Sequence, residues 1–315
     1  MEIINYHYPK KTGKTTNLAV ALGYFDGVHS AHRELLLLLI KKAKEKNLTP
    51  CVFTFANSPS KSKKTQTTIY NIDDKLKFFD EIGIKTVILA NFDSISSLSP
   101  LAFVNEVLID DLGAHFAICG YNFKFGKHAA GTAADLINMM AARGKEALCV
   151  DRVTLGGKTI SSTAIRELIS NKKIKEATNL LGSPYFIRAT VEKGLGLGTG
   201  FGFPTVNTSI RSDSPLSPGV YRTAVKIGQN LYTGITNVGT CPTIKEREIH
   251  AETLIVDFCG DIYGEEIQIF FLDFLREEKL FSSVEELREQ IYKDREISIK
   301  ENGDLKWLAT GLNLL

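Results

Sequence analysis

The stretch LAVALGYFDGVHSAH, which runs from Leu18 to His32, is the strongest indication of the fold of the first half of the chain. Its five leading apolar residues predict a buried strand, and Gly23 and Gly27 permit a tight turn directly behind it. His29 and His32 then stand three residues apart at the start of a predicted helix, so both imidazoles share one face. Exposed backbone N–H groups and the helix dipole favour an anion at such a place. The stretch therefore predicts an anion-binding edge on an α/β sheet.

A second stretch, ISSTAIR at Ile160–Arg166, offers related chemistry later in the chain. Ser161, Ser162 and Thr163 place hydroxyl groups at a predicted helix start, and Arg166 follows one turn later, where its guanidinium suits a phosphate. A Ser/Thr cluster before a helix is by itself most often a cap, and a His-x-x-His spacing alone is at best even odds for a site. The two motifs together on one α/β sheet are far more specific.

Short β-branched runs alternate with helical patterns through the first half, which predicts a parallel sheet flanked by helices. The best-marked helix starts at Ser99, which suits an N-cap, with Pro100 at the first helical position and Gly113 as its stop. The expected strands are 18–22, 51–55, 86–89, 116–119 and 147–150, and the expected helices lie near 30–46, 72–82, 100–111 and 133–143.

After about residue 184 the pattern changes to short β-rich segments separated by turn residues, which predicts an antiparallel barrel or sandwich. A final helix is expected from Ser283, where Ser283 and Glu286 form a capping box. We place the domain boundary at Gly182-Ser183-Pro184, giving domains 1–184 and 185–315. The expected strands of the second domain are 185–192, 219–227, 231–238, 251–258 and 266–274.

Composition narrows the class of protein. The 315 residues carry a formal net charge of +2, which supplies no broad attraction for nucleic acid or anionic lipid. The five cysteines are widely spaced and lack a Cys-x-x-Cys pair, so we expect neither a disulfide framework nor a zinc site. No apolar run is long enough for a signal peptide or a membrane span. We therefore expect a cytoplasmic protein without a nucleic-acid or membrane partner, and the sequence leaves its oligomeric state open.

Along nearly its full length the chain resembles the bacterial bifunctional riboflavin kinase/FAD synthetases, whose N-terminal half belongs to the HxGH nucleotidyltransferase superfamily. The resemblance implies a Rossmann-like nucleotidyltransferase domain followed by an antiparallel β-barrel of the riboflavin kinase kind and a terminal helix. The stretches that carry it, in chain order, are GYFDGVHSAH, SLSPLAFVNEVLIDDLGAHFAICGYNFKFGKHAAGTA, ISSTAIR, GFPTVN, NVGTCPT, ETLIVDF with DIYG behind it, and FLREEKLFSSVEELREQI.

For the first domain the resemblance implies transfer of AMP from ATP to FMN, which gives FAD and pyrophosphate. The catalytic residues would be His29, His32 and Arg166. Two larger sets are implied as well: Gly23, Phe25, Gly27, His29, His32, Ser162, Thr163 and Arg166 at the ATP phosphates, and Asn122, Phe123, Phe125 and Gly126 at the flavin. For the two phenylalanines taken alone, membership of an alternating strand core is the more common explanation.

For the second domain the resemblance implies ATP-dependent phosphorylation of riboflavin to FMN. Glycines recur at every second position from Gly194 to Gly202, which gives a loop whose backbone can approach phosphate closely. Gly194, Gly198, Gly202 and Pro204 would then contact ATP, while Thr205 and Asn207 would hold Mg²⁺ in the same phosphate and metal loop. Glu252 would be the catalytic base; the simpler alternative is an outward polar residue on a half-buried strand.

Several positions depart from the family pattern. Ala31 stands where the HxGH glycine is usual, and Ser58 replaces a common histidine. Asn122 replaces a frequent aspartate, and Leu195, Leu197 and Cys241 stand where relatives often have arginine. Two alternatives therefore stay open beside the bifunctional enzyme: a protein with one of the two activities, and a non-enzymatic flavin-binding regulator. Retention of Glu252 together with the other site residues argues against the regulator.

Overall fold

The computed structural model describes residues 1–9, 17–56, 67–193, 205–240 and 249–300. The chain forms two compact units: residues 1–66 with 70–161, and residues 67–69 with 162–315. Each unit has its own sheet and its own core. No helix among the described residues is both long and apolar enough to cross a bilayer.

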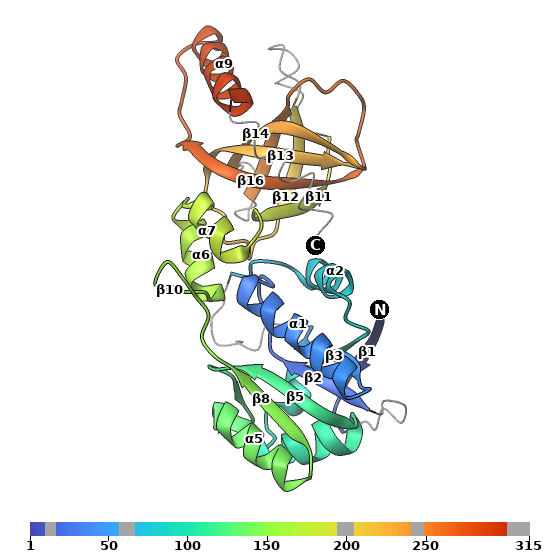
Figure 1. Ribbon diagram of the computed structural model, residues 1–315. Helices are drawn as coiled ribbons and strands as arrows, with labels where there is room; N and C mark the ends of the chain where they lie inside the picture. The colour runs from blue at the N-terminus through green and yellow to red at the C-terminus, as the bar shows by residue number, and fades with distance from the viewer. Residues whose placement is uncertain (10–16, 57–66, 194–204, 241–248, 301–315) are drawn as a thin grey trace. The chain divides into compact units, whose positions relative to one another are not determined.

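The first unit is built on a six-stranded, fully parallel sheet in the order β1-β4-β3-β2-β5-β8 (Figure 1). All five predicted strands are confirmed to within two residues. Strand β1 was not predicted and adds an edge to the sheet. The strands are β1 (Glu2–Tyr6), β2 (Leu18–Leu22), β3 (Thr49–Phe55), β4 (Thr86–Ala90), β5 (Ala114–Gly120) and β8 (Glu146–Val150).

The order of the strands reverses at β2, which pairs with β3 on one side and with β5 on the other. Ligands of doubly wound sheets bind outside the carboxyl ends of the strands at such a reversal. Leu22 of β2 lies in register with Cys119 of β5, so the segments that begin at Gly23 and Gly120 leave the sheet side by side. The fold therefore brings the GYFDGVHSAH turn next to the segment expected to bind flavin.

Helices cover both faces of this sheet. On one face, α1 (Ser30–Glu45) buries Leu35, Leu36 and Leu39 against β2, β3 and β5, and α2 (Ile72–Ile82) packs beside it. On the other face, the helix η1 (Phe103–Asp111) and α5 (Ala133–Ala142) join a core with Val20, Phe53 and Ile88. This arrangement confirms the predicted parallel sheet flanked by helices.

The predicted helix 100–111 forms with its expected ends, but its pitch differs from the expectation. Ser99 caps it, since its hydroxyl accepts the N–H of Ala102 at 3.1 Å, and Pro100 occupies its first turn. After α4 (Pro100–Ala102), η1 continues as a wide π-helix with the i→i+5 bond pattern. Gly113 ends it with φ of +63°.

The second unit is a nearly closed antiparallel barrel in the strand order β11-β16-β13-β14-β15-β12 (Figure 1). A bridge between Glu192 and Asn207 brings the two edges together, with the Glu192 N–H donating to the Asn207 carbonyl at 2.8 Å. The strands are β11 (Phe186–Thr190), β12 (Thr205–Ile210), β13 (Gly219–Ile227), β14 (Asn230–Thr240), β15 (Ile249–Ile255) and β16 (Glu266–Arg276). The expectation of a barrel is confirmed.

One strand of the barrel corrects the sequence prediction. Thr205 and Asn207 were expected in a phosphate and metal loop, but both lie on β12, which pairs with β15 along its length. The polar sequence TVNTSI has no clear alternation of its own. Its strand conformation comes from pairing with β15 and from closure of the barrel at Glu192.

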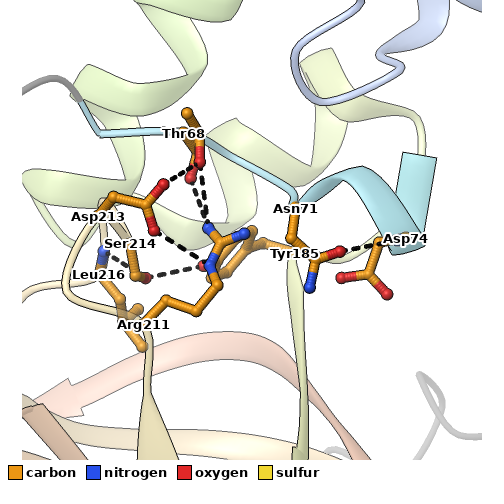
Figure 2. A network of polar contacts seen from close by, with 8 residues as sticks. All are labelled: Thr68, Asn71, Asp74, Tyr185, Arg211, Asp213, Ser214 and Leu216. Atoms are coloured by element: carbon orange, nitrogen blue, oxygen red, sulfur yellow. Dashed lines mark hydrogen bonds and ion pairs between the residues drawn. The ribbon is translucent and has the colours of Figure 1, made fainter. Parts of the chain in front are cut away.

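A short segment of the N-terminal half belongs to the second unit. Thr68 donates its N–H to the Asp213 carbonyl at 2.8 Å and its hydroxyl to an Asp213 carboxylate oxygen at 2.5 Å. Arg211 Nη2 donates to the Thr68 carbonyl at 2.9 Å, and Arg211 also forms an ion pair with Asp213. Figure 2 shows this network beside Tyr185 and Ser214, whose hydroxyl oxygens lie 3.0 Å apart.

The terminal helix α9 (Val284–Lys300) packs on the outside of the barrel over β13 and β14, where Ile299 contacts a small apolar cluster around Val220 and Ile235. Ser283 caps the helix, because its hydroxyl accepts the Glu286 N–H at 3.2 Å. The second half of the expected capping box is shifted by one residue: the Glu286 carboxylate accepts the N–H of Ser282, not that of Ser283.

Two candidate active sites

The GYFDGVHSAH turn is strained. Phe25, Gly27 and Val28 all have positive φ, at +53°, +85° and +39°. Only glycine adopts such values readily, and a β-branched residue there is an outlier that costs about 1–3 kcal/mol. Both Phe25 and Val28 are buried, at 3 % and 0 % exposure, so packing holds the turn in this shape. Strain of this kind clusters at functional sites.

His29 and His32 lie together at the start of α1. Their rings are stacked, with centroids 3.6 Å apart and planes 13° apart. His29 is the N-cap of α1, since its Nδ1 accepts the N–H of His32 at 3.3 Å. Nδ1 of His32 is buried and has no hydrogen-bond partner among the described residues. The predicted placement of both imidazoles on one face is confirmed.

Burial controls the protonation of this pair. It lowers the pKa of His29 to about 4, with a smaller contribution from the charge of Arg33. The pKa of His32 is also lowered, chiefly by burial and then by the neighbouring His29 and Lys75. Both rings are therefore neutral near pH 7. Because Nδ1 of His29 accepts a hydrogen bond, the proton of its neutral ring is on Nε2, which is then a donor for a phosphate oxygen.

The second motif forms the first turn of α6 (Ser162–Ser170) in the second compact unit. Ser162 and Thr163 begin the helix as expected, and Arg166 follows one turn later. Nη2 of Arg166 donates to the hydroxyl of Thr163 at 3.2 Å. The structure thus brings these three residues together, while their joint action with His29 and His32 stays a prediction.

The segment after β5 carries the residues expected at the flavin. Asn122 is exposed in the turn that follows Gly120, whereas Phe125 is 6 % exposed and belongs to the core. Phe123 is half-buried and stacks on Phe125 at 5.5 Å. Gly126 has φ of +71°, and a Cβ there would lie 2.8 Å from the Pro100 nitrogen, so this turn requires glycine. The strand-core explanation fits Phe125, and the flavin role of all four residues stays a prediction.

The candidate kinase residues meet on the outer face of the barrel. Thr205 donates its hydroxyl to an oxygen of Glu252 at 2.7 Å. Asn207 lies directly opposite Glu252 across β12 and β15, and cross-strand partners of this kind share a face. Glu252 is exposed, whereas its neighbours Ala251 and Thr253 point into the barrel and are fully buried. Hydroxyl, amide and carboxylate oxygens are the ligand types that Mg²⁺ prefers, so this donor set fits the expected metal.

Sequence reasoning missed one member of this row. Asn237 lies opposite Glu252 on the other side, so Asn207, Glu252 and Asn237 form a line across β12, β15 and β14. The side-chain oxygen of Asn237 is buried and has no partner among the described residues. The signal available was the NVG stretch itself, which the resemblance included without giving its asparagine a role.

Some predicted positions lie outside the described residues: Gly194, Gly198, Gly202 and Pro204 of the expected ATP loop, and Ser58, Leu195, Leu197 and Cys241 among the departures from the family pattern. Ala31 is described and lies in the first turn of α1, partly exposed.

Comparisons with known proteins divide the chain into an N-terminal and a C-terminal part. The family model for FAD synthetase matches residues 11–164, and the model for riboflavin kinase matches residues 181–301. The boundary near residue 184 stays a prediction, since the compact units divide at Ser161 and the models leave residues 165–180 between them.

Curated relatives match over most of their length. The bifunctional riboflavin kinase/FMN adenylyltransferase of Bacillus subtilis is 32% identical over 91% of this chain and 93% of the relative. The protein of the same name from Listeria monocytogenes is 33% identical over 94% and 96%, and that from Escherichia coli K12 is 31% identical over 90% and 91%.

A solved structure is also similar over nearly the whole chain. It is described as a macrolide-efflux protein from Streptococcus pneumoniae, shares 31% sequence identity and has a TM-score of 0.85 over 95% of this chain and 99% of that one. That description belongs to the solved protein, and the likeness shows a shared fold. Because the two family models match successive parts of the chain and curated relatives match both parts in one polypeptide, the chain belongs to the bifunctional riboflavin kinase/FMN adenylyltransferase family.

Proposed function

We propose that the barrel unit phosphorylates riboflavin to FMN and that the nucleotidyltransferase domain adenylylates FMN to FAD, each with its own set of residues. Riboflavin kinase and FMN adenylyltransferase are the activities of the family to which the chain belongs. The observation that carries the assignment to sites is that each matched region contains its own polar cluster: His29 and His32 in one, Thr205 with Glu252 in the other.

In the nucleotidyltransferase domain, the phosphate of FMN attacks the α-phosphorus of ATP in line and pyrophosphate leaves. The protein forms no covalent bond and supplies position and electrostatic stabilisation. The neutral His29 donates from Nε2 to the triphosphate, and His32 lies against it. The guanidinium of Arg166 and the hydroxyls of Ser162 and Thr163 hold the phosphates from the second motif. Asn122 contacts the flavin.

In the barrel unit, Glu252 accepts the proton of the riboflavin hydroxyl as that oxygen attacks the γ-phosphorus of ATP and ADP leaves. The Thr205 hydroxyl holds the carboxylate in place through their 2.7 Å hydrogen bond. Thr205 and Asn207 would hold Mg²⁺, which when bound neutralises charge on the ATP phosphates. We infer that Gly194, Gly198, Gly202 and Pro204 complete the ATP site. Mg²⁺ is usually held by a few protein oxygens together with substrate phosphates, so the ATP phosphates would complete its shell.

The alternatives with a single activity or with none predict different products. Ala31 and Ser58 make the adenylyl transfer the step to question first, whereas a regulator would need to bind flavin but would not need a base such as Glu252. We also propose that the enzyme works in the cytoplasm, which rests on its spacing of cysteines; Cys51 and Cys119 are buried as free thiols.

Two separate assays test the proposal. Riboflavin with ATP and Mg²⁺ gives FMN followed by FAD, and FMN with ATP and Mg²⁺ gives FAD directly. Chelation of Mg²⁺ stops FMN formation, and re-addition restores it. If FMN formed but FMN supplied directly stayed unchanged, the chain would be a kinase alone. Unchanged riboflavin and unchanged FMN would favour the regulator.

A further inference from the structure

Lys75 is a buried charge that the proposed mechanism leaves unused. It lies on α2 and is 2 % exposed. Its ammonium donates to the carbonyl oxygen of Tyr24 at 3.1 Å and lies 4.1 Å from the centre of the Tyr24 ring. Burial of an ammonium group is unfavourable unless the charge is paired or used. Both of these contacts are with Tyr24 of the GYFDGVHSAH turn.

The carbonyl of Tyr24 is held from two sides. Besides Lys75 of α2, the hydroxyl of Thr54, at the end of β3, donates to the same oxygen at 3.2 Å. A planar trans peptide directs the next N–H opposite to its carbonyl. The N–H of Phe25 therefore points away from Lys75 and Thr54, and it has no backbone acceptor among the described loop residues. Fixing the carbonyl fixes the direction in which this donor is presented.

Two further residues on the same face of α2 support the turn. Phe79 packs against Phe25 at 5.8 Å between ring centroids, and Phe25 in turn meets the edge of His32 at 5.2 Å. Phe78 lies 5.4 Å from the guanidinium of Arg33, whose Nε donates to the carbonyl of Val28 at 3.0 Å. Positions 75, 78 and 79 follow the i, i+3, i+4 spacing of one helix face. Lys75 and Phe79 therefore contact the turn directly, and Phe78 supports it through Arg33.

We propose that Lys75 is a positioning residue for adenylyl transfer: it holds the Tyr24 carbonyl so that the turn presents its N–H groups and both imidazoles to the triphosphate of ATP. The inference rests on the proposed function of the nucleotidyltransferase domain. Lys75 acts through Tyr24 and does not itself touch ATP, whose contacts remain those of the proposed function.

The charge of Lys75 makes the binding of ATP depend on pH. The charged and titratable groups that face it are Asp26 and Tyr24 of the turn and His32 of α1, with Asp74 beside it on α2. Burial lowers the pKa of Lys75 to about 8, and Asp26 opposes that shift. A bound triphosphate favours the protonated form, so ATP binds more weakly once Lys75 has lost its proton.

The test compares Lys75→Met with Lys77→Met. Methionine keeps the length of the side chain and its contact with the Tyr24 ring but lacks the donor and the charge, while Lys77 is exposed on the same helix. FAD formation from FMN is measured beside FMN formation from riboflavin in the same preparation. Lys75→Met is expected to lower kcat/KM for ATP in FAD formation by about tenfold or more, with FMN formation and the Lys77→Met variant unchanged.

A second measurement uses the wild-type chain and does not depend on the folding of a variant. KM for ATP in FAD formation is expected to rise about tenfold between pH 7 and pH 9.5, relative to KM for ATP in FMN formation over the same range, which corrects for the ionisation of ATP itself. In Lys75→Met this relative rise is expected to be absent.

Two results would overturn the proposal: FAD formation by Lys75→Met within twofold of wild type, or a wild-type KM ratio that is flat across the pH range. Failure of the proposed function looks different, because the wild-type chain would then make no FAD from FMN at any pH. A loss of FAD formation in Lys75→Met together with a flat wild-type ratio would assign Lys75 a purely structural role and would equally overturn the proposal.

Discussion

The rings of His29 and His32 are stacked with centroids 3.6 Å apart, and the nitrogen of His29 that faces the chain already accepts the N–H of His32. This arrangement gives His29 two tasks. Its Nδ1 caps α1, and its Nε2 remains as a neutral donor at the helix N-terminus. A neutral donor pair beside an anion avoids the cost of burying two like charges.

Replacement of His29 by alanine is expected to reduce FAD formation from FMN by about 100-fold or more, because removal of one preorganised donor to a developing charge has costs of that size. FMN formation from riboflavin should stay at the wild-type rate, since its residues lie in the barrel. Both products are measured by chromatography of the flavins. His115→Ala, an exposed histidine on β5, is the control; equal damage to both steps would contradict the assignment of two independent sites.

The low pKa of His29 predicts acid sensitivity of the fold. Its folded pKa is about 4, below the unfolded value of 6.5, so the unfolded chain binds more protons between these values. The contribution of His29 to stability is therefore full above pH 6.5 and is lost as the pH falls towards 4, by about 3 kcal/mol. His29→Asn keeps a side chain that can cap α1. Urea unfolding followed by circular dichroism at pH 7 and pH 4.5 should show a smaller loss of stability in this variant than in wild type; an equal loss would contradict the assignment.

Replacement of Glu252 by glutamine is expected to lower FMN formation by about 100-fold or more, since the variant keeps the shape of the side chain but cannot accept the proton. FAD formation from supplied FMN should be unchanged. Glu265→Gln, on an exposed turn before β16, serves as the matched control. Wild-type FMN formation by Glu252→Gln would support the alternative of an outward polar residue.

A buried carboxylate ties α9 to the barrel beside its apolar contacts. Asp294 is 3 % exposed and accepts two nitrogens of Arg276 at 2.9–3.3 Å and the amide of Gln290 at 2.9 Å. Asp294→Ala removes the charged hydrogen bonds from Arg276 and is expected to cost the barrel unit about 2 kcal/mol. Thermal unfolding measures the loss. Glu289→Ala, on the exposed face of α9, should unfold like wild type; a similar result for Asp294→Ala would show that the helix is held by other contacts.

The sequence predicted the elements that are marked by their own residues, through a run of apolar side chains or through residues typical of helix ends. Strand β2 and helix α2 appear with the expected bounds because LAVAL is wholly buried and because Asn71 and Gly83 mark the helix ends. Strand β1 was missed, since EIINY is mostly exposed at the edge of the sheet and shows no alternation. The sequence does not predict strand β12, because its conformation depends on partners about 45 residues away in the chain.

The candidate sites were predicted as sets of residue types and not as geometry. The pairing of His29 with His32 follows from their spacing, and the structure confirms it. The neutrality of both rings depends on burial by Phe25 and the helices, which no local pattern reveals. Lys75 illustrates the same limit: within IDDKLKFF it resembles an exposed lysine of a charged helix face, and only the tertiary fold places it under the turn.

Complementation between two variants distinguishes two independent sites in one polypeptide from a single shared site. His29→Ala and Glu252→Gln are each incubated with riboflavin, ATP and Mg²⁺, alone and as a mixture. We predict that His29→Ala stops at FMN, that Glu252→Gln leaves riboflavin unchanged, and that the mixture makes FAD because FMN released by one variant is adenylylated by the other. The claim of two independent sites would be contradicted if the mixture accumulated FMN without FAD and if Glu252→Gln alone also made no FAD from supplied FMN.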